Sequence, residues 1–402
     1  MVKEKHISKY LIFVILGFVI LRFPYGTPAI AKIFNAVMIL SFVITLFSFS
    51  SFKLLKKDSI FLYFLMVFMV LFLLFSSAYN GFVLKREHFI RGMIMPILFI
   101  NLFTVSLIKD TWGRLKVIDF VLTTFVLVNF VIMILFPNGW FKSELYDLNW
   151  FLGFKNVMIR TILPALTINA IIAYHKYGRL NRWNYVYFFI CFITIFLSHS
   201  STSLLMIVIY GVCVMGIPLL RKIKYFTLLV AFLIPLIITI TIVIYNIQDQ
   251  YTVFFEKELG KDTTFTGRTF IWEYVILKIF QSPILGYGYH PSLEWNTIYS
   301  DFSNFTISHP HNFILYMLIQ GGFVYFGMFV FLLIYVTKCT WKDRKEPVIC
   351  LLNIMYFTFF IGGITESITE CLYMFPMMGL FTTIRDSIYN EKIGNHYRLW
   401  SL

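Results

Sequence analysis

Long apolar runs separated by short polar turns dominate the chain. A helix of about 20 apolar residues is long enough to cross a lipid bilayer. The pattern predicts about twelve such spans. Their approximate cores are 10–22, 33–52, 60–79, 92–108, 117–136, 157–174, 184–198, 203–220, 225–245, 312–336, 347–365 and 371–388. The expected fold is an all-α polytopic integral membrane protein, with a single membrane domain over residues 1–402.

One segment, residues 246–311, breaks this pattern because it is long and largely polar. Long loops inside compact domains are usually functional. Within it, residues 269–281 have the periodicity of an amphipathic helix, and Pro283 follows as a stop signal. The apolar residues expected near one face are Phe270, Tyr274, Val275 and Leu277. We therefore expect a helix that lies on the membrane surface.

The Lys and Arg residues predict how the spans are oriented in the membrane. If the N-terminus lies in the cytoplasm, every predicted inner loop carries at least three Lys or Arg residues. The positive-inside rule then places both termini in the cytoplasm and residues 246–311 outside it. The formal charge of +14 follows from the same bias, so no nucleic-acid partner is expected. We expect residues 10–22 to be a retained helix because no small-residue cleavage site follows them.

The composition supports the membrane assignment, since 59% of residues are hydrophobic and 13% are charged. Soluble domains have roughly 25% charged residues. None of the five cysteines lies in the long loop, so no disulfide framework is expected there.

Three arginines are candidate site residues. Arg268 follows Gly267 at the start of the expected surface helix, where free backbone N–H groups and a guanidinium fork suit phosphate. Arg160 lies near the outer end of the 157–174 span, and a cation in that position usually faces a polar cavity. Arg91, like Arg86, flanks the 92–108 span from outside, against the positive-inside bias. The alternative for each arginine is contact with lipid headgroups.

Two histidines, His309 and His311, precede the 312–336 span. An imidazole is the side chain best suited to act as a general base near neutral pH. The pair could instead bind a metal, with further ligands from His290, Glu294 and Asp301, but no HExxH-like spacing is present. A third alternative is that His311 and Asn312 only cap the following helix. We expect no metal and no cofactor.

Two further polar groups have plain structural interpretations. Residues 198–203 form a corner rich in Ser and Thr between two short spans, which is typical of helix capping. Glu366 and Glu370 lie one helical turn apart between the last two spans. They could form a cation site, although a solvated turn is the interpretation we favour.

Taken together, these motifs resemble the O-antigen ligase and polymerase family of bacterial surface polysaccharide assembly. The resemblance depends on short motifs along the chain. They are Gly153-Phe154-Lys155-Asn156, Gly267-Arg268, Ser282-Pro283 with Gly286-Tyr287-Gly288, His311-Asn312 and Gly321-Gly322. The family often has Ser-Arg-Thr where this chain has Ser200-Ser201-Thr202, so Ser201 stands in place of an arginine.

The resemblance implies an inverting, metal-independent glycosyltransferase that acts at the outer face of the cytoplasmic membrane. Its donor would be a glycan on undecaprenyl pyrophosphate. His311 would be the catalytic base, while Arg268, Arg160, Arg91, Asn312 and His309 would contact substrate. Membrane lipid is an implied partner, together with a flippase and a chain-length regulator.

The resemblance covers both polymerases of repeat units and ligases that transfer glycan to lipid A core. The chain is rich in Phe, Ile, Lys and Asn, which hints at an AT-rich, Gram-positive genome. A ligase needs an outer membrane, so this composition favours a polymerase of capsule or exopolysaccharide. A lipid-linked glycan flippase or a secondary transporter is the second class of function. Transporters usually place ionisable groups at mid-membrane. Here the polar features gather on one predicted outer face, which favours an enzyme.

Overall fold

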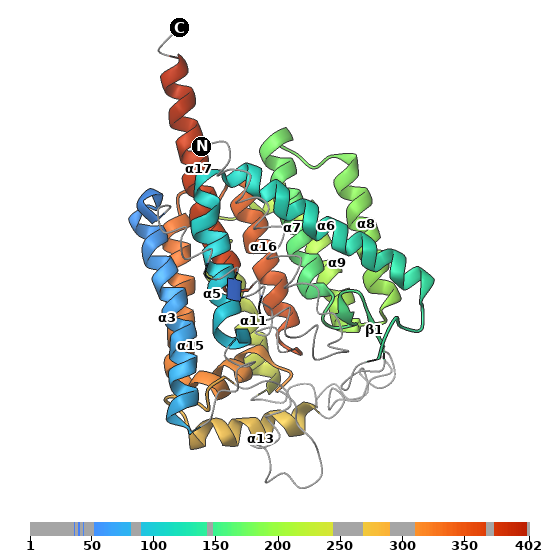
Figure 1. The fold of residues 1–402 in the computed structure, drawn as a ribbon, viewed down its shortest axis with the longest axis vertical. Helices are drawn as coiled ribbons and strands as arrows, with labels where there is room; N and C mark the ends of the chain where they lie inside the picture. The colour runs from blue at the N-terminus through green and yellow to red at the C-terminus, as the bar shows by residue number, and fades with distance from the viewer. Residues whose placement is uncertain are drawn as a thin grey trace.

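The computed structural model describes residues 36, 39–40, 43, 52–81, 90–142, 148–243, 268–289, 310–366 and 374–399, and every structural statement below concerns these residues. They form a mostly helical bundle (Figure 1). The longer helices are α3 (Lys57–Tyr79), α6 (Thr111–Leu135), α7 (Ile159–Tyr177), α8 (Arg182–Leu197), α9 (Ser201–Met215), α11 (Leu228–Val243), α13 (Arg268–Gln281), α15 (Phe313–Thr340), α16 (Pro347–Gly362) and α17 (Gly379–Leu399).

Shorter elements complete the described chain. They are η2 (Ile90–Ile94), α5 (Met95–Ile100), η3 (Asn101–Val105), η4 (Ser106–Lys109), α10 (Ile217–Leu220), η7 (Pro376–Met378) and the strands β1 (Asn149–Trp150) and β2 (Gly153–Phe154). The two strands pair antiparallel as a small hairpin. The four elements from η2 to η4 follow one another without a gap.

Four helical segments are long and apolar enough to cross a membrane, namely Lys57–Tyr79, Gly92–Lys109, Thr111–Leu135 and Phe313–Thr340. Four shorter apolar helices, α8, α9, α11 and α16, accompany them. Each predicted core from 60–79 onward coincides with helical structure, which is consistent with the expected helical membrane protein. The core at 10–22, and most of that at 33–52, lie outside the described residues. The number of twelve spans therefore stays a prediction.

Helix α16 lies at the centre of the bundle, where it packs against α7, α9 and α11. Helix α15 packs along α3 and also touches α11. Aromatic rings fill the space between these helices. Phe232, Phe313, Phe329 and Phe360 meet mostly edge to face, an arrangement that aromatic pairs favour. This packing sets the position of the helix ends that carry the polar residues described below.

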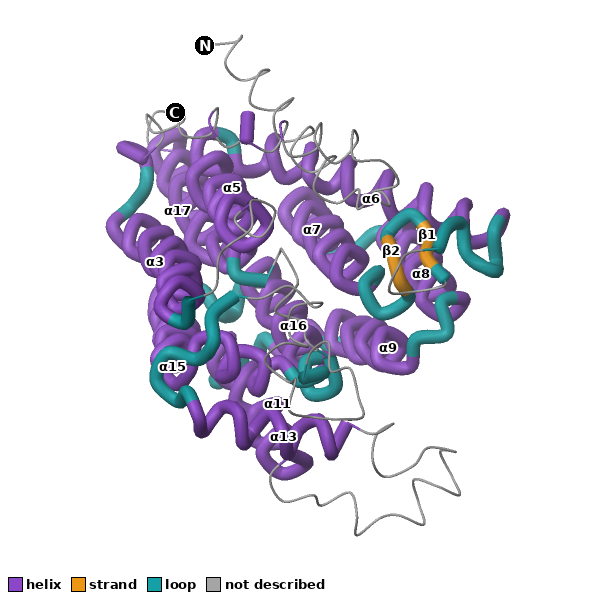
Figure 2. Tube along the Cα trace, turned by 60° about the horizontal axis from the view of Figure 1, so that its bottom comes forward, coloured by secondary structure: helices purple, strands orange, loops and turns teal. Residues whose placement is uncertain are grey.

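Helix α13 lies across one end of the bundle, and α17 projects from the opposite end (Figures 1 and 2). We call the end with α13 the site end. Helix α13 buries Trp272, Val275 and Ile279 against Leu315, Tyr316 and Ile319 of α15.

The predicted apolar face of α13 needs correction. Phe270 and Leu277 are 60% and 62% exposed, whereas Val275, assigned to the same face, is fully buried. The helix has two apolar faces, and packing against α15 decides which of them is buried. The exposed one suits a membrane surface, although the position of the helix in the membrane stays a prediction.

Helix α15 is interrupted at Gly322, whose φ of +61° lies in the left-handed region. The break leaves backbone groups without their usual helical partners, and residues 283–288 supply new ones. The Phe323 N–H donates to the Pro283 carbonyl at 2.7 Å, and the Gly288 N–H donates to the Gln320 carbonyl at 2.7 Å. The Ser-Pro, Gly-Tyr-Gly and Gly-Gly motifs therefore form one structural joint between α13 and α15.

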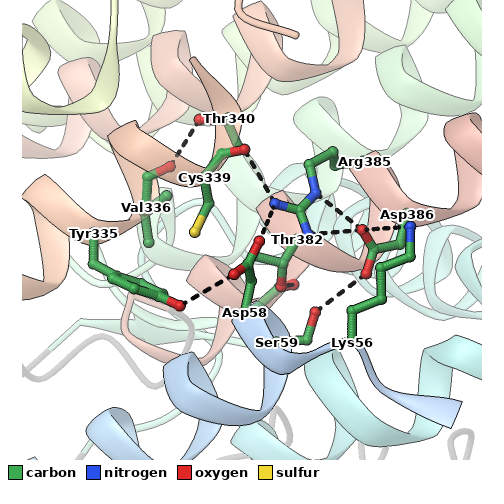
Figure 3. A network of polar contacts seen from close by, with 11 residues as sticks. Lys56, Asp58, Ser59, Tyr335, Val336, Cys339, Thr340, Thr382, Arg385 and Asp386 are labelled. Carbon is green, nitrogen blue, oxygen red and sulfur yellow. Dashed lines mark hydrogen bonds and ion pairs between the residues drawn. The ribbon is translucent and has the colours of Figure 1, made fainter. Parts of the chain in front are cut away.

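A polar network joins two helices at the end of the bundle opposite the site end (Figure 3). Arg385 of α17 pairs with Asp58 of α3 at 2.9 Å and with the neighbouring Asp386 at 2.8 Å. Lys56 and Ser59 also contact Asp386, which is 1% exposed. This network joins α3 to α17 far from the site end. A buried carboxylate needs such partners because burial of an unpaired charge is costly.

Candidate functional site

Two of the predicted site residues meet at the carboxylate of Glu366, just beyond α16. Arg268 Nη2 lies 3.1 Å from Glu366 Oε1, and His311 Nδ1 lies 3.9 Å from Glu366 Oε2. Glu366 is only 7% exposed. The expectation of a solvated turn is therefore wrong for Glu366, while Glu370 lies outside the described residues. The sequence singled out Glu366 but did not indicate that its carboxylate lies between Arg268 and His311.

Helix α13 directs Arg268 into the bundle because of its register. Arg268 is the first residue of α13, and it lies four and seven positions before Trp272 and Val275. Residues at these spacings share one face of an α-helix. The arginine therefore points to the side on which Trp272 and Val275 are buried, and its side chain is 20% exposed. Gly267 lies outside the described residues.

The turn before α15 positions His311. The Trp272 Nε1–H donates to the Pro310 carbonyl at 3.0 Å, so α13 holds this turn directly. His311 itself has a φ of +50°, which is uncommon for a residue with a side chain. Conformations of this kind persist where the surroundings fix them, and they often mark functional sites.

Asn312 is the N-cap of α15. Its Oδ1 accepts from the N–H groups of Ile314 and Leu315, each at 3.0 Å, and its Nδ2 donates to the Ile364 carbonyl at 2.9 Å. The residue is fully buried. Both ends of the amide are thus used to cap α15 and to tie it to the segment that carries Glu366. The alternative that both residues only cap the helix therefore holds for Asn312. The side chain of His311 instead faces the Glu366 carboxylate.

Asn156 connects the site to the serine-rich corner. Its Nδ2 donates to Glu366 Oε1 at 3.0 Å, and its Oδ1 accepts from Ser200 Oγ at 2.7 Å. Ser200 also caps α9 by accepting from the Ser203 N–H. The capping role expected for this corner is confirmed. In addition, the corner fixes the orientation of an amide that contacts Glu366.

The charged groups near Glu366 favour the ionised form of its carboxyl. Burial alone would raise the pKa of this carboxyl, but the His311 side chain and the charges of Arg268 and Arg160 outweigh burial and hold the pKa below its ordinary value. Arg160, on α7, is 7% exposed. Arg268 and the His311 imidazole thus lie against the carboxylate, and the charge of Arg160 also acts on it. An anionic ligand would find an excess of positive charge there.

The remaining predicted residues are not part of this cluster as described. Arg91 lies in η2, and the described structure does not include its side chain. His309, His290, Glu294 and Asp301 lie outside the described residues. Within the described ranges, no three His, Cys, Asp or Glu side chains are placed so that they could hold a metal ion together. Ser201, which stands where the family often has an arginine, is exposed on the first turn of α9. The two arginines whose charges act on Glu366 belong to α13 and α7.

Fold and site together define a multi-pass helical membrane protein with a cationic, histidine-containing site at one end of its bundle. Residues 186–332 match the family model described as O-antigen ligase. This match confirms the resemblance to the O-antigen ligase and polymerase family, and it includes Arg268 and His311. The family implies a glycosyl-transfer-type enzyme of O-antigen-related polysaccharide biosynthesis. A search of curated proteins found no match.

Proposed function

We propose that the protein is a polymerase that joins undecaprenyl-pyrophosphate-linked oligosaccharide repeat units into capsular, exopolysaccharide or O-antigen chains. The observation that carries this proposal is the meeting of Arg268 and His311 at one buried carboxylate. These two residues lie 43 positions apart, so only the fold brings them together. A cation and a general base in one site are what glycosyl transfer from a pyrophosphate donor requires.

In the proposed reaction, His311 takes the proton from an acceptor sugar hydroxyl. The hydroxyl oxygen forms a bond to the anomeric carbon of the donor while the bond from that carbon to the pyrophosphate oxygen breaks. Attack opposite the leaving group inverts the anomeric centre. The departing lipid pyrophosphate keeps the electron pair, and Arg268 and Arg160 stabilise its negative charge. Arg160 thereby serves in place of the arginine that relatives carry at the Ser201 position. No metal takes part in these steps.

The proposal places the site end at the outer face of the cytoplasmic membrane, with both termini in the cytoplasm. The polyprenyl tail of the donor would stay in membrane lipid beside the apolar helices. A flippase would supply the repeat units from the inner face, and a chain-length regulator would set the size of the product. Contacts from Arg91 and His309 to substrate also belong to this proposal.

Analysis of lipid-linked sugars in a strain lacking the gene tests the proposal. Without a polymerase, single repeat units should accumulate on lipid at the outer leaflet, and polymer should disappear. Wild-type protein should restore polymer, while His311→Ala should not, although both proteins reach the membrane. Accumulation of long lipid-linked polymer would instead identify a ligase. Repeat units confined to the inner leaflet would identify a flippase or transporter.

A further inference from the structure

The carboxylate of Glu366 contacts both residues to which the proposed reaction assigns chemistry. Its Oε1 lies 3.1 Å from Arg268 Nη2, and its Oε2 lies 3.9 Å from His311 Nδ1. The two oxygens therefore face different partners. Asn156 donates to Oε1 at 3.0 Å and limits rotation of the carboxylate. Such a geometry suggests that Glu366 fixes the relative positions of the base and the phosphate-binding cation.

Glu366 is itself held from several directions. It follows α16, and the neighbouring residues Gly363 and Ile364 accept hydrogen bonds from the Phe313 N–H and from Asn312 Nδ2, at 2.7 and 2.9 Å. The segment before Glu366 is thus attached to the start of α15, next to His311. Asn156 reaches Glu366 from the segment before α7, and Ser200 holds Asn156. A carboxylate fixed in this way can orient other side chains.

We propose that Glu366 is a positioning residue of the transferase, a role that rests on the proposed function. Its carboxylate faces Nδ1 of the His311 ring at 3.9 Å, an arrangement that leaves Nε2 for the acceptor hydroxyl. A carboxylate on one ring nitrogen orients an imidazole and stabilises its protonated form after it accepts a proton. The same carboxylate holds Arg268 within reach of the donor pyrophosphate. Glu366 does not contact the reacting atoms.

The charged groups that face the His311–Glu366 pair in the described structure come from two other elements. Arg268 reaches it from α13, and Arg160 acts on Glu366 from α7. Both are cations, so Glu366 is the only negative charge among these groups. If that charge is removed, the protonated form of the His311 imidazole should become less stable relative to the neutral form. The acid limb of the pH–activity profile should then move to lower pH, which a purely structural role would not produce.

The test uses Glu366→Gln, which keeps an oxygen that accepts from Asn156 but removes the charge. Glu366→Asp keeps the charge at a shorter reach, and Glu273→Gln, an exposed position on α13, is the matched control. Polymer is measured in complemented cells. Initial rates against pH are measured in membrane vesicles supplied with a lipid extract from the gene-deletion strain.

We expect Glu366→Gln to lose at least about tenfold in rate, since positioned acid–base groups contribute about 10²–10⁴-fold. Its acid limb should move to lower pH, Glu366→Asp should recover part of the rate at the wild-type profile, and Glu273→Gln should match wild type. A normal rate in Glu366→Gln, or a lower rate with an unchanged profile, would overturn the inference. If Glu366→Gln does not reach the membrane, Glu366→Asp decides the question. A properly inserted Glu366→Asp without measurable rate, or with a pH profile unlike that of wild type, would then overturn the inference.

His311→Ala, assayed in parallel, separates this inference from the proposed function. If His311→Ala is inactive while Glu366→Gln behaves as wild type, only the role of Glu366 fails. If His311→Ala retains full activity, the proposed reaction itself fails.

Discussion

The indole of Trp272 donates a hydrogen bond to the carbonyl of Pro310 at 3.0 Å. This bond joins the helix that begins with Arg268 to the residue that precedes His311. Trp272 is 1% exposed, so water does not replace the bond when it is lost. The separation between the arginine and the histidine therefore depends on Trp272, which joins the segments that carry them.

Trp272→Phe should keep most of the packing of α13 and remove the donor to Pro310. A buried carbonyl left unpaired costs about 1–3 kcal/mol. We expect a lower melting temperature in detergent and a reduced amount of polymer. Phe270→Leu, at an exposed position of the same helix, is the control. Unchanged melting and unchanged polymer in Trp272→Phe would show that the bond does not set the site.

Arg268→Lys should cause a large loss of polymer at a normal protein level in the membrane. The lysine keeps the positive charge but loses the planar fork that binds phosphate through two hydrogen bonds. Lys278→Arg, on the same helix, makes the opposite exchange away from the site and should leave polymer unchanged. Surface polysaccharide is scored by gel and immunoblot. Full polymer length and amount in Arg268→Ala would rule out a role in donor binding.

His311→Ala should nearly abolish polymer, because a positioned general base contributes about 10²–10⁴-fold in rate. His309→Ala should cost less, since His309 lies outside the His-Asn pair and precedes Pro310, which restricts its backbone. Both variants are compared in the deletion strain by lipid-linked repeat units. An inactive His309→Ala beside an active His311→Ala would reverse the assignment. Loss of wild-type activity with a chelator would favour a metal site instead.

Gly288→Ala should destabilise the joint between α13 and α15. The φ of Gly288 is +87°, and an added Cβ would collide with the backbone of Ser77 on α3. We expect a lower melting temperature and less protein in the membrane. Gly327→Ala, on α15, meets no atom within 4 Å and has no positive φ, so it is the matched control. Equal stability of the two variants would contradict the structural role of the glycine motif.

The proposed orientation of the bundle can be tested with single cysteines in a background without the native ones. Glu273 on α13 and Lys342 after α15 are both exposed and lie toward opposite ends of the bundle. In intact cells, Glu273→Cys should react with a membrane-impermeant maleimide and Lys342→Cys should not. Permeabilised cells supply the control for reactivity. The reverse labelling pattern would place the site in the cytoplasm and remove the proposed function.

The sequence was sufficient for most of the fold because membrane helices carry a strong local signal. Apolar length located the bundle helices from 60–79 onward, and amphipathic periodicity located α13. It could not choose the buried face of α13, since Phe270 and Val275 are both apolar and only packing against α15 distinguishes them. Likewise, the break at Gly322 depends on hydrogen bonds from residues 283–288, which are distant in sequence.

The site was only partly visible in the sequence. Arg268 and His311 were singled out because each begins or precedes a helix after a polar stretch. Glu366 was assigned to a solvated turn because two carboxylates one helical turn apart, between two apolar runs, have the pattern of an exposed turn. Its burial arises from contacts with Asn156, Arg268 and His311, which come from three other parts of the chain. Asn156 carried a signal through its family motif, although that motif did not indicate its partner.

The interruption of α15 at Gly322 has a mechanical consequence. The first part of the helix, Phe313–Gly321, is attached to α13 through the bond between Trp272 and Pro310, and to the segment after α16 through Asn312. The second part, beyond Gly322, lies alongside α3 and contacts the Arg385 network through Tyr335 and Cys339. Residues 283–288 bond to the backbone on both sides of the break, so the segment that follows α13 holds the two parts of α15 together.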